Sequence, residues 1–264
     1  MFCHPERSEG PAFVRVSDGP ECVVTGLCPA TTREFKSGSE MPPPTSFSED
    51  AAPAVQGWLH TPDAPNGDAL ILTHGAGGNC NAPLLVALSE TFCGRGYTVL
   101  RCDLPFRQAR RTGPPFPGNA ERDRTGLRNA VAAMRKHTNG MIYLGGHSYG
   151  GRQATMLCAA EHDLVAGLLL LSYPLHPPRK PEQLRVQHLP NLRTPSLFVH
   201  GTRDPFGSIE EMKKALQLVP APTKLVEIEG AGHDLGFKGK QANDLLARVP
   251  AEFATIFQST KASI

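Results

Sequence analysis

The sequence has few aromatic residues, no long apolar run and almost no net charge. The last two features each argue against one class of binding partner. Aromatic residues make up 6% of the 264 positions, with a single tryptophan. No apolar stretch reaches the roughly 18 residues that a membrane span needs. Lys and Arg number 27 against 25 Asp and Glu, a net charge of +2. We therefore expect neither a membrane nor a nucleic acid as a partner, since nucleic-acid binding needs a strong basic excess on one face.

The cysteines follow no regular spacing and include no CxxC pair. This pattern favours neither a disulfide framework nor a cysteine-based metal site. Buried free thiols in a reducing cytoplasm are the simpler interpretation. We expect a cytoplasmic protein that needs no metal and no organic cofactor. The seven positions are Cys3, Cys22, Cys28, Cys80, Cys93, Cys102 and Cys158.

The first 40 residues differ in character from the rest of the chain. They hold four basic and six acidic residues, and they show no sustained helical or strand periodicity. We expect residues 1–48 to be a disordered N-terminal extension, with Met41 as an alternative start. The 40% of hydrophobic residues is enough for a sizeable core, which we assign to one domain over residues 49–264.

After residue 50 the chain alternates short apolar runs with amphipathic segments, and it shows no internal repeat. This alternation predicts an α/β fold with a mostly parallel sheet and helices on both faces. We predict an edge strand over 55–60 and a long loop, rich in Pro and Arg, over 104–117. The further expected strands cover 69–73, 97–102, 141–144, 165–171, 196–199 and 224–228. The expected helices run over about 84–92, 127–134, 150–161, 209–216 and 245–256.

Gly146-His147-Ser148-Tyr149-Gly150 lies between an expected strand and an expected helix. The spacing is typical of a nucleophile elbow, a tight strand-to-helix turn that exposes a serine. Glycines two residues before and after the serine avoid collisions with the neighbouring strand and helix. The motif alone is weak evidence for an elbow, since roughly one chain in ten would contain it by chance. Its position between an expected strand and an expected helix makes the evidence stronger. Ser148 is the candidate nucleophile.

Two more polar residues follow the ends of late strands. Asp204, in Gly-Thr-Arg-Asp-Pro, comes after the strand at 196–199, and His233, in Gly-Ala-Gly-His-Asp, comes after the last strand. Taken singly, Asp204 is more simply a turn residue and His233 a surface histidine. Taken together, the chain order Ser, Asp, His matches that of α/β-hydrolase catalytic triads. We expect His233 to act as general base and Asp204 to orient it.

His74-Gly75-Ala76-Gly77-Gly78 follows the strand at 69–73. A loop in this position supplies one backbone donor of an oxyanion hole, and the residue after the nucleophile supplies the other. We assign these donors to Tyr149 and Ala76, with Gly77 as the alternative to Ala76. His74 is better interpreted as a structural residue whose ring ties the loop down through a hydrogen bond.

From about Val55 to the C-terminus the chain resembles the α/β-hydrolase superfamily. Within it, the chain is similar to the branch shared by dienelactone-hydrolase-like bacterial proteins and the testis-expressed-protein-thirty type domain. Many members carry Arg-Ser-Met at the elbow, where this chain has His147-Ser148-Tyr149. The resemblance implies a serine-hydrolase domain with Ser148, Asp204 and His233 in the triad positions. The resembling segments are LTHGAGG (72–78), RCDLPFR (101–107), GGHSYGGR (145–152), YPLHPP (173–178) and 198–206, which includes GTRDP.

Three residues near the expected site are candidates for substrate binding. Arg107 lies in the Arg-rich loop with Arg101, Arg110 and Arg111, which could hold an anionic group. A structural ion pair to Asp103 is the simpler and favoured interpretation. Tyr173 and Leu175 either line the pocket or merely end a strand. The segment that follows them spans only about twenty residues, so we expect a minimal lid or none.

These observations predict a serine hydrolase that cleaves a small-molecule carboxylic ester, with a thioester or a lactone as related substrates. The competing hypothesis is a non-catalytic interaction module on the same scaffold, since fold does not imply function. Retention of all three triad residue types favours catalysis. The sequence leaves the oligomeric state open.

Overall fold

The computed structural model describes residues 42–261, of which the side chains up to residue 257 are described. Of the predicted extension over 1–48, residues 1–41 lie outside the described residues. Strand β1 (Thr45–Glu49) belongs to the fold, so the predicted domain boundary at residue 49 was too late. Phe47, the one apolar residue of β1, is buried. A single apolar position is too short a pattern to predict a strand from the sequence.

Eight strands form one sheet in the order β1-β2-β4-β3-β5-β6-β7-β8. The pairs β1–β2 and β2–β4 are antiparallel, and all the others are parallel. The predicted mostly parallel sheet is confirmed, but the strand at 55–60 is not its edge, because β1 covers it. After β1, the strands are β2 (Val55–His60), β3 (Ala69–Thr73), β4 (Thr98–Cys102), β5 (Ile142–His147), β6 (Gly167–Leu171), β7 (Ser196–Gly201) and β8 (Thr223–Ile228).

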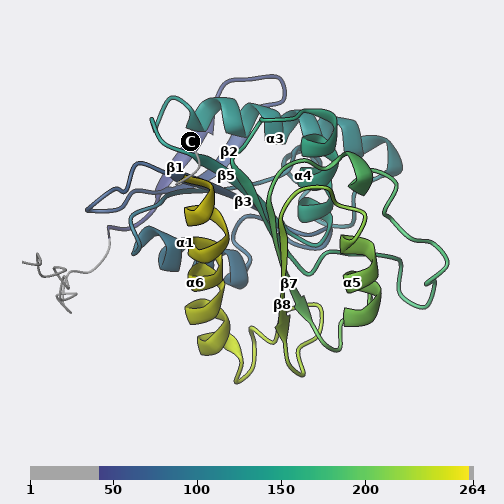
Figure 1. Ribbon diagram of the computed structural model, residues 1–264. Coiled ribbons are helices and arrows are strands. Elements are labelled where there is room, and N and C mark those ends of the chain that lie inside the picture. Colours follow the sequence, from purple (N-terminus) through teal and green to yellow (C-terminus); the bar gives the residue numbers. More distant parts are fainter. Residues whose placement is uncertain (1–41, 262–264) are drawn as a thin grey trace, which may run out of the picture. The chain divides into compact units, whose positions relative to one another are not determined.

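Helices cover both faces of the sheet (Figure 1). On one face, α1 and α6 pack against each other and against the strands. On the other face, α3, α4 and α5 build a second core. The helices are α1 (Pro83–Cys93), α2 (Pro105–Ala109), α3 (Ala120–Met134), α4 (Tyr149–Ala160), α5 (Ile209–Leu216) and α6 (Ala242–Lys261), with short 3₁₀ turns at Pro117–Asn119 and Leu189–Asn191.

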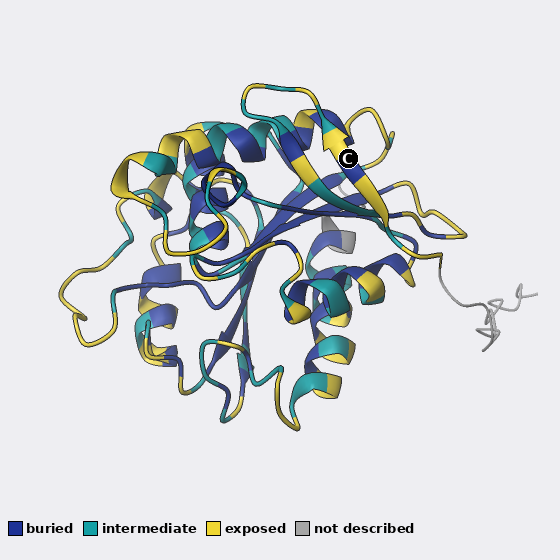
Figure 2. Cartoon of the chain, turned by 180° about the vertical axis from the view of Figure 1, so that it is seen from behind, coloured by how far each residue is buried: buried dark blue, intermediate teal, exposed yellow. Residues whose placement is uncertain are grey.

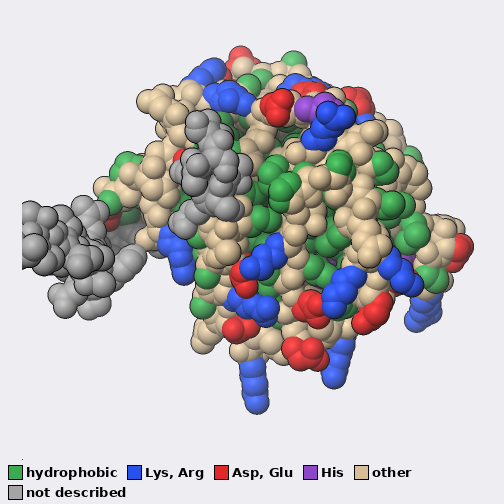
Figure 3. All heavy atoms as spheres, in the orientation of Figure 1, with side chains coloured by type: hydrophobic (Ala, Val, Ile, Leu, Met, Phe, Trp, Pro, Cys, Tyr) green, Lys and Arg blue, Asp and Glu red, His purple; other side chains and the backbone are tan. Residues whose placement is uncertain are grey.

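The central strands are buried on both faces, as Figure 2 shows, while the outward faces of the helices are exposed. Every residue of β3, β6 and β7 is buried, which explains why these strands appear in the sequence as continuous apolar runs. The surface drawn in Figure 3 mixes acidic and basic side chains and shows no stripe of one sign. Within residues 42–261, no helix is both long enough and apolar enough to cross a membrane.

Two local predictions about helices can be compared with the structure. Helix α5 begins with the capping box that Ser208 and Glu211 predict, in which each side chain accepts a hydrogen bond from the other residue's backbone N–H (3.2 and 2.8 Å). The loop predicted over 104–117 instead contains α2, which begins at Pro105. A five-residue helix is too short for a periodic signal, and only the proline at its first position hinted at it.

The segment between β6 and β7 contains only the 3₁₀ turn at Leu189–Asn191. In the part of the chain that the structure describes, this segment therefore forms no helical cap over the carboxyl ends of the strands, as predicted. Within the described residues, the loops after β3, β5, β7 and β8 meet at this edge of the sheet, because the carboxyl ends of parallel strands point the same way.

Candidate active site

Ser148 lies in a strained turn between β5 and α4. Its backbone has φ 50° and ψ −114°, a conformation that non-glycine residues rarely adopt. Its N–H donates to the Leu171 carbonyl of the neighbouring strand at 2.8 Å, which helps to hold the turn. A Cβ at Gly146 would lie 2.6 Å from the Gly151 nitrogen, and one at Gly150 would lie 2.6 Å from the His74 oxygen. The elbow thus requires both glycines for the close approach that the sequence predicted.

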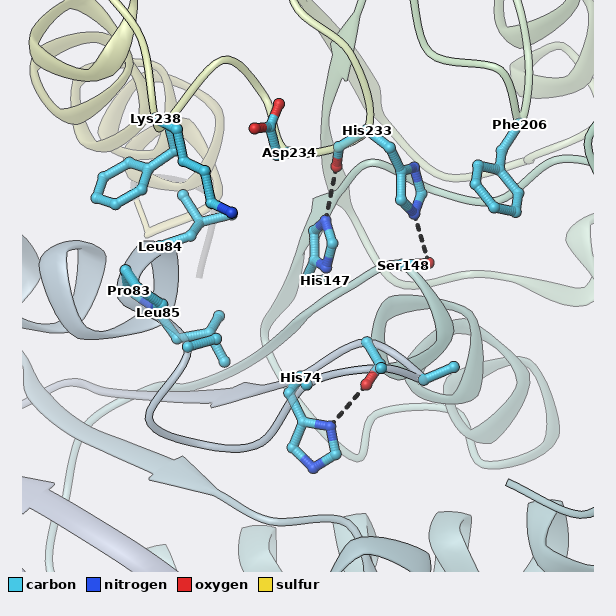
Figure 4. Close-up of a pocket in the computed structure, with 16 residues that line it drawn as sticks. His74, Pro83, Leu84, Leu85, His147, Ser148, Phe206, His233, Asp234 and Lys238 are labelled. Carbon is cyan, nitrogen blue, oxygen red and sulfur yellow. Dashed lines mark hydrogen bonds between the residues drawn. The ribbon is translucent and has the colours of Figure 1, made fainter. Parts of the chain in front are cut away.

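The structure brings together the three residues that the chain order linked. His233 Nε2 lies 2.8 Å from Ser148 Oγ, and His233 Nδ1 lies 2.8 Å from Asp204 Oδ2. Asp204 is fully buried at its side chain, and its Oδ1 accepts a hydrogen bond from the Phe206 N–H. The carboxylate therefore accepts from Nδ1–H, which leaves Nε2 to face the serine hydroxyl. Figure 4 shows His233 directed at Ser148, with Phe206 beside the imidazole.

His74 holds the loop after β3 in place through two hydrogen bonds of its ring. This buried side chain donates from Nδ1 to the Gly75 carbonyl (2.8 Å) and accepts at Nε2 from the Leu104 N–H (3.1 Å). Burial lowers the pKa of His74, in keeping with the neutral ring that this hydrogen-bond pattern needs. The ring thus ties the loop down and does not serve as a second base, as the sequence analysis predicted.

Arg107 does not line the cavity, contrary to its selection as a candidate for substrate binding and in keeping with the favoured structural interpretation. It is 5% exposed and is absent from the lining of the cavity beside Ser148. Its guanidinium donates to four backbone carbonyls, and two of them belong to the loop after β3. They are those of Ala76 (2.9 Å), Gly78 (2.7 Å), Arg110 (3.1 Å) and Gly113 (3.0 Å). Arg107 is therefore an internal brace of the loop that carries the predicted oxyanion donor.

The neighbouring arginines are also held by the protein itself. Arg101 is buried, and it donates to His60 Nε2 (2.9 Å), to the Cys80 carbonyl (2.8 Å) and to Asn81 Oδ1 (2.6 Å). Arg110 donates to the Pro114 carbonyl and stacks over the Phe116 ring. The predicted ion pair between this loop and Asp103 is not among the salt bridges of the described residues. Asp103 instead accepts from the Cys80 N–H at 2.6 Å.

Tyr173 and Leu175 are buried in the core, each 1% exposed, and neither lines the cavity. The Tyr173 hydroxyl donates to the Arg185 carbonyl at 2.8 Å. Of the two alternatives, the structure excludes the one in which Tyr173 and Leu175 line the pocket. The sequence could not decide it, because a residue that ends a strand can point into the site or into the layer beneath.

A cavity of about 420 Å³ opens beside Ser148 and His233. Most of its wall is apolar and comes from the start of α1 and from two phenylalanines that sequence reasoning missed. Asp234 and Lys238 are its exposed charged residues. The apolar lining consists of Ala82, Pro83, Leu84, Leu85, Phe206 and Phe237, together with the glycines of the loop after β3.

His147 is a further residue whose position the sequence did not reveal. It ends β5, lines the cavity and donates from Nε2 to the backbone carbonyl of His233 at 2.8 Å. Burial lowers the pKa of His147 to about 4, with a contribution from the nearby His233 ring, so the ring is neutral at pH 7. The only signal in the sequence was that His147 stands where many relatives have arginine.

Tyr149 contributes its backbone to the elbow and its side chain to the packing beneath. As the first residue of α4, it has a backbone N–H with no partner inside the helix. Its hydroxyl donates to Asp123 Oδ2 at 2.8 Å, while Asp123 Oδ1 accepts from the Phe106 N–H. This buried carboxylate links α2, α3 and α4 under the site. Within the described residues, no group of three or more His, Cys, Asp or Glu is arranged to hold a metal ion.

Comparison with known proteins agrees with this architecture. Residues 66–258 match the family model described as alpha/beta hydrolase domain. A dienelactone hydrolase from Anabaena variabilis superposes with a TM-score of 0.67 at 20% identity, covering 83% of this chain and 99% of that one. An alpha-beta serine hydrolase homologue from Coxiella burnetii gives a TM-score of 0.63 at 18% identity, with 80% and 99% covered.

A third structure, from Xanthomonas campestris, is described as an α/β serine hydrolase without a lid. It superposes with a TM-score of 0.64 at 16% identity, covering 81% of this chain and 98% of that one. At these identities the solved structures show the fold, and the family match extends over more than half of the sequence. The chain belongs to the alpha/beta hydrolase family.

Proposed function

We propose that this protein is a serine hydrolase that cleaves a small carboxylic ester through an acyl-enzyme on Ser148. The observation that carries the proposal is the hydrogen-bond chain from Ser148 Oγ to His233 and on to Asp204, each link 2.8 Å long. Ser148 and His233 both line the largely apolar cavity beside the serine. Such a chain is the arrangement by which a neutral imidazole activates a hydroxyl.

The reaction proceeds in two halves. His233 Nε2 takes the proton of Ser148 as Oγ bonds to the ester carbonyl carbon, and it then gives that proton to the departing alcohol oxygen. In the second half, His233 takes a proton from water, whose oxygen attacks the acyl carbon. The acid leaves, and the proton returns to Ser148 Oγ. Throughout, Asp204 keeps Nδ1 protonated and stabilises the imidazolium.

We assign the oxyanion hole to the backbone N–H groups of Tyr149 and Ala76, with Gly77 as the alternative to Ala76. The C=O and N–H of a trans peptide point in opposite directions. Because the Gly75 carbonyl is bonded to the His74 ring, the Ala76 N–H points away from that ring. Figure 4 draws His74 on the side of the loop away from Ser148. Loss of one such donor typically costs about 2.7–4 kcal/mol of transition-state stabilisation.

The cavity supports a compact substrate with an apolar acyl or alcohol group. Its volume of about 420 Å³ lies within the usual range for small-molecule sites. Thioesters and lactones remain related substrates, because the same attack on a carbonyl opens them. The four described cysteines are buried and free, which supports the proposed cytoplasmic location.

Fluorophosphonate labelling tests the proposal, because this reagent reacts with an activated serine. We expect the wild-type protein to be labelled and Ser148→Ala not to be, with hydrolysis of short neutral esters falling roughly 10⁴–10⁶-fold in the variant. Equal labelling of the two proteins would contradict the proposal. A folded wild type that neither reacts nor hydrolyses any ester would favour the non-catalytic interaction module.

A further inference from the structure

Three arginines lie close to one another near the elbow. The charges of two of them act on His188, and Arg152 is near both Arg185 and the Tyr173 hydroxyl, with which it forms a hydrogen bond. We call Arg124 (α3), Arg152 (α4) and Arg185 (the segment before β7) the arginine cluster. Arg152 is one helical turn beyond the nucleophile, and its N–H donates to the Ser148 carbonyl at 3.0 Å. Helical side chains lean toward the N-terminus of their helix, so Arg152 covers the turn that begins at Ser148.

Neighbouring polar residues link these arginines into one half-buried group. Arg124 donates to Gln153 Oε1 at 3.0 Å. His188 lies 2.8 Å from the Thr155 hydroxyl, on the same helix as Arg152. Arg185 carries the carbonyl that accepts from the Tyr173 hydroxyl, and its own guanidinium reaches only the Pro174 carbonyl, at 3.3 Å. All three arginines are of intermediate burial.

The positive charge of the cluster is poorly compensated within the described residues. Its one ion pair joins Arg124 to Glu121, whose side chain is 71% exposed. Arg152 Nε is buried without a hydrogen-bond acceptor, and so is Nε2 of the fully buried Gln153. Burying such donors unpaired is costly. Burial together with the charges of Arg152 and Arg124 lowers the pKa of His188 to about 4, and burial and Arg152 lower that of Arg185.

We propose that the arginine cluster is a binding site for a carboxylate or phosphate group. Guanidinium groups hold these planar or tetrahedral oxyanions through paired, charge-assisted hydrogen bonds, and two buried donors here have no acceptor. None of the three arginines lines the cavity beside Ser148. The group is therefore either a free anion bound beside the elbow or the far end of a substrate that extends beyond this cavity. In both cases it is recognised by the same side chains.

Thermal unfolding in inorganic phosphate tests the site directly, with ionic strength held constant by chloride. We expect phosphate to raise the melting temperature of the wild-type protein, because a ligand that binds only the folded state stabilises it. Arg152→Gln should weaken the apparent phosphate affinity at least tenfold, and Arg185→Gln serves as a second variant if the first does not fold. Arg122→Gln is the matched control, since Arg122 is an exposed arginine on α3 outside the cluster.

Two pairs of esters then distinguish the sources of the anion. Monomethyl glutarate is compared with methyl pentanoate, and 4-acetoxybutanoate with butyl acetate. If the anion belongs to the substrate, the wild type prefers the charged member of one pair, and Arg152→Gln lowers that ratio of kcat/KM about tenfold through KM. If the anion is free, phosphate stabilises the protein in an Arg152-dependent way without a preference for charged esters.

The site is overturned if phosphate leaves the wild-type melting temperature unchanged and neither charged ester is preferred. It is also overturned if Arg152→Gln and Arg122→Gln respond alike in both assays. Failure of the proposed function is a separate result. In that case no ester is hydrolysed by the wild type, while phosphate still stabilises it through Arg152.

Discussion

Arg107 and Arg152 lie on two sides of Ser148, and their surroundings differ in the supply of hydrogen-bond acceptors. Arg107 donates to four carbonyls, and Arg101 donates to three groups; two acceptors of each belong to the loop after β3. We call this pair the bracing arginines. In the arginine cluster, Arg152 has a buried Nε without an acceptor, and within the described residues the Arg185 guanidinium donates to one carbonyl, that of Pro174 at 3.3 Å. The comparison teaches that clustering of arginines along the chain does not by itself point to a binding site, and that the acceptors around each guanidinium have to be compared as well.

Among the substitutions considered, Arg107→Leu should cause the largest loss of stability and activity. The substitution removes the donor to four carbonyls, and each buried acceptor left unpaired costs about 1–3 kcal/mol. We expect a loss of roughly 3–5 kcal/mol in the free energy of unfolding and a loss of at least tenfold in kcat/KM as the loop loosens. Urea denaturation and ester hydrolysis measure both. If Arg107→Leu matched the wild type in stability, the distinction between bracing and binding arginines would fail.

Both groups of arginines have a histidine beside them, His60 buried and His188 half-buried, and this predicts how stability depends on pH. His60 accepts from Arg101 Nε, and burial, then Arg101, lowers its pKa to about 4. His188, beside the arginine cluster, has a pKa of about 4 as well. The unfolded chain, with a histidine pKa near 6.5, binds more protons between pH 6.5 and 4, so stability falls as the pH falls through this window.

We expect the free energy of unfolding to drop by a few kcal/mol between pH 6.5 and pH 4, since one pKa unit corresponds to about 1.4 kcal/mol. Denaturant titrations at several pH values measure the slope. His60→Gln, beside the bracing arginines, and His188→Gln, beside the arginine cluster, should each reduce the slope of the unfolding free energy against pH. An unchanged slope in both variants would show that these histidines are not neutral in the folded protein.

A smaller effect, on phosphate affinity, should follow from placing a carboxylate within the arginine cluster. Gln153→Glu places a carboxylate where the Gln153 amide accepts from Arg124. We expect the phosphate affinity of the folded protein to fall about tenfold, because the new carboxylate competes for the guanidinium groups. The melting temperature in chloride, measured alongside, should change little. Phosphate affinity equal to that of the wild type would mean that Arg124 takes no part in the site.

The smallest effect should be that of Arg110→Ala. Arg110 is a half-buried neighbour of the bracing arginines that contacts the Pro114 carbonyl and the Phe116 ring. Surface substitutions of this kind usually change stability by less than about 0.5 kcal/mol. We expect ester hydrolysis and unfolding to match the wild type. A large loss would extend the brace beyond Arg101 and Arg107.

The sequence predicted the elements that are long or strongly patterned. Two features could be predicted because they depend only on residues that are near in sequence. They are the apolar runs of β3, β6 and β7 and the glycines around Ser148. The chain order of Ser148, Asp204 and His233 then placed the candidate triad, because parallel strands deliver their following loops to one edge.

The failures have a common physical cause, which is that burial of a polar or terminal residue depends on distant partners. Arg107 is buried because carbonyls about thirty positions earlier in the chain accept its hydrogen bonds, and no local pattern contains them. Tyr173 points into the core because the Arg185 carbonyl satisfies its hydroxyl. β1 was missed because its pairing with β2, and not its own composition, makes it a strand.

The bond from His147 to the His233 carbonyl has a consequence for how the loop after β8 can vary in length. It fixes the backbone of His233 to the residue before Ser148, so His233 is held both at its ring and at its main chain. Insertions between Gly230 and His233 would have to preserve both sets of hydrogen bonds, whereas insertions at Gly239, beyond this turn, would not disturb them. A longer loop that enlarges the cavity wall can therefore be engineered on the Phe237 side without moving His233.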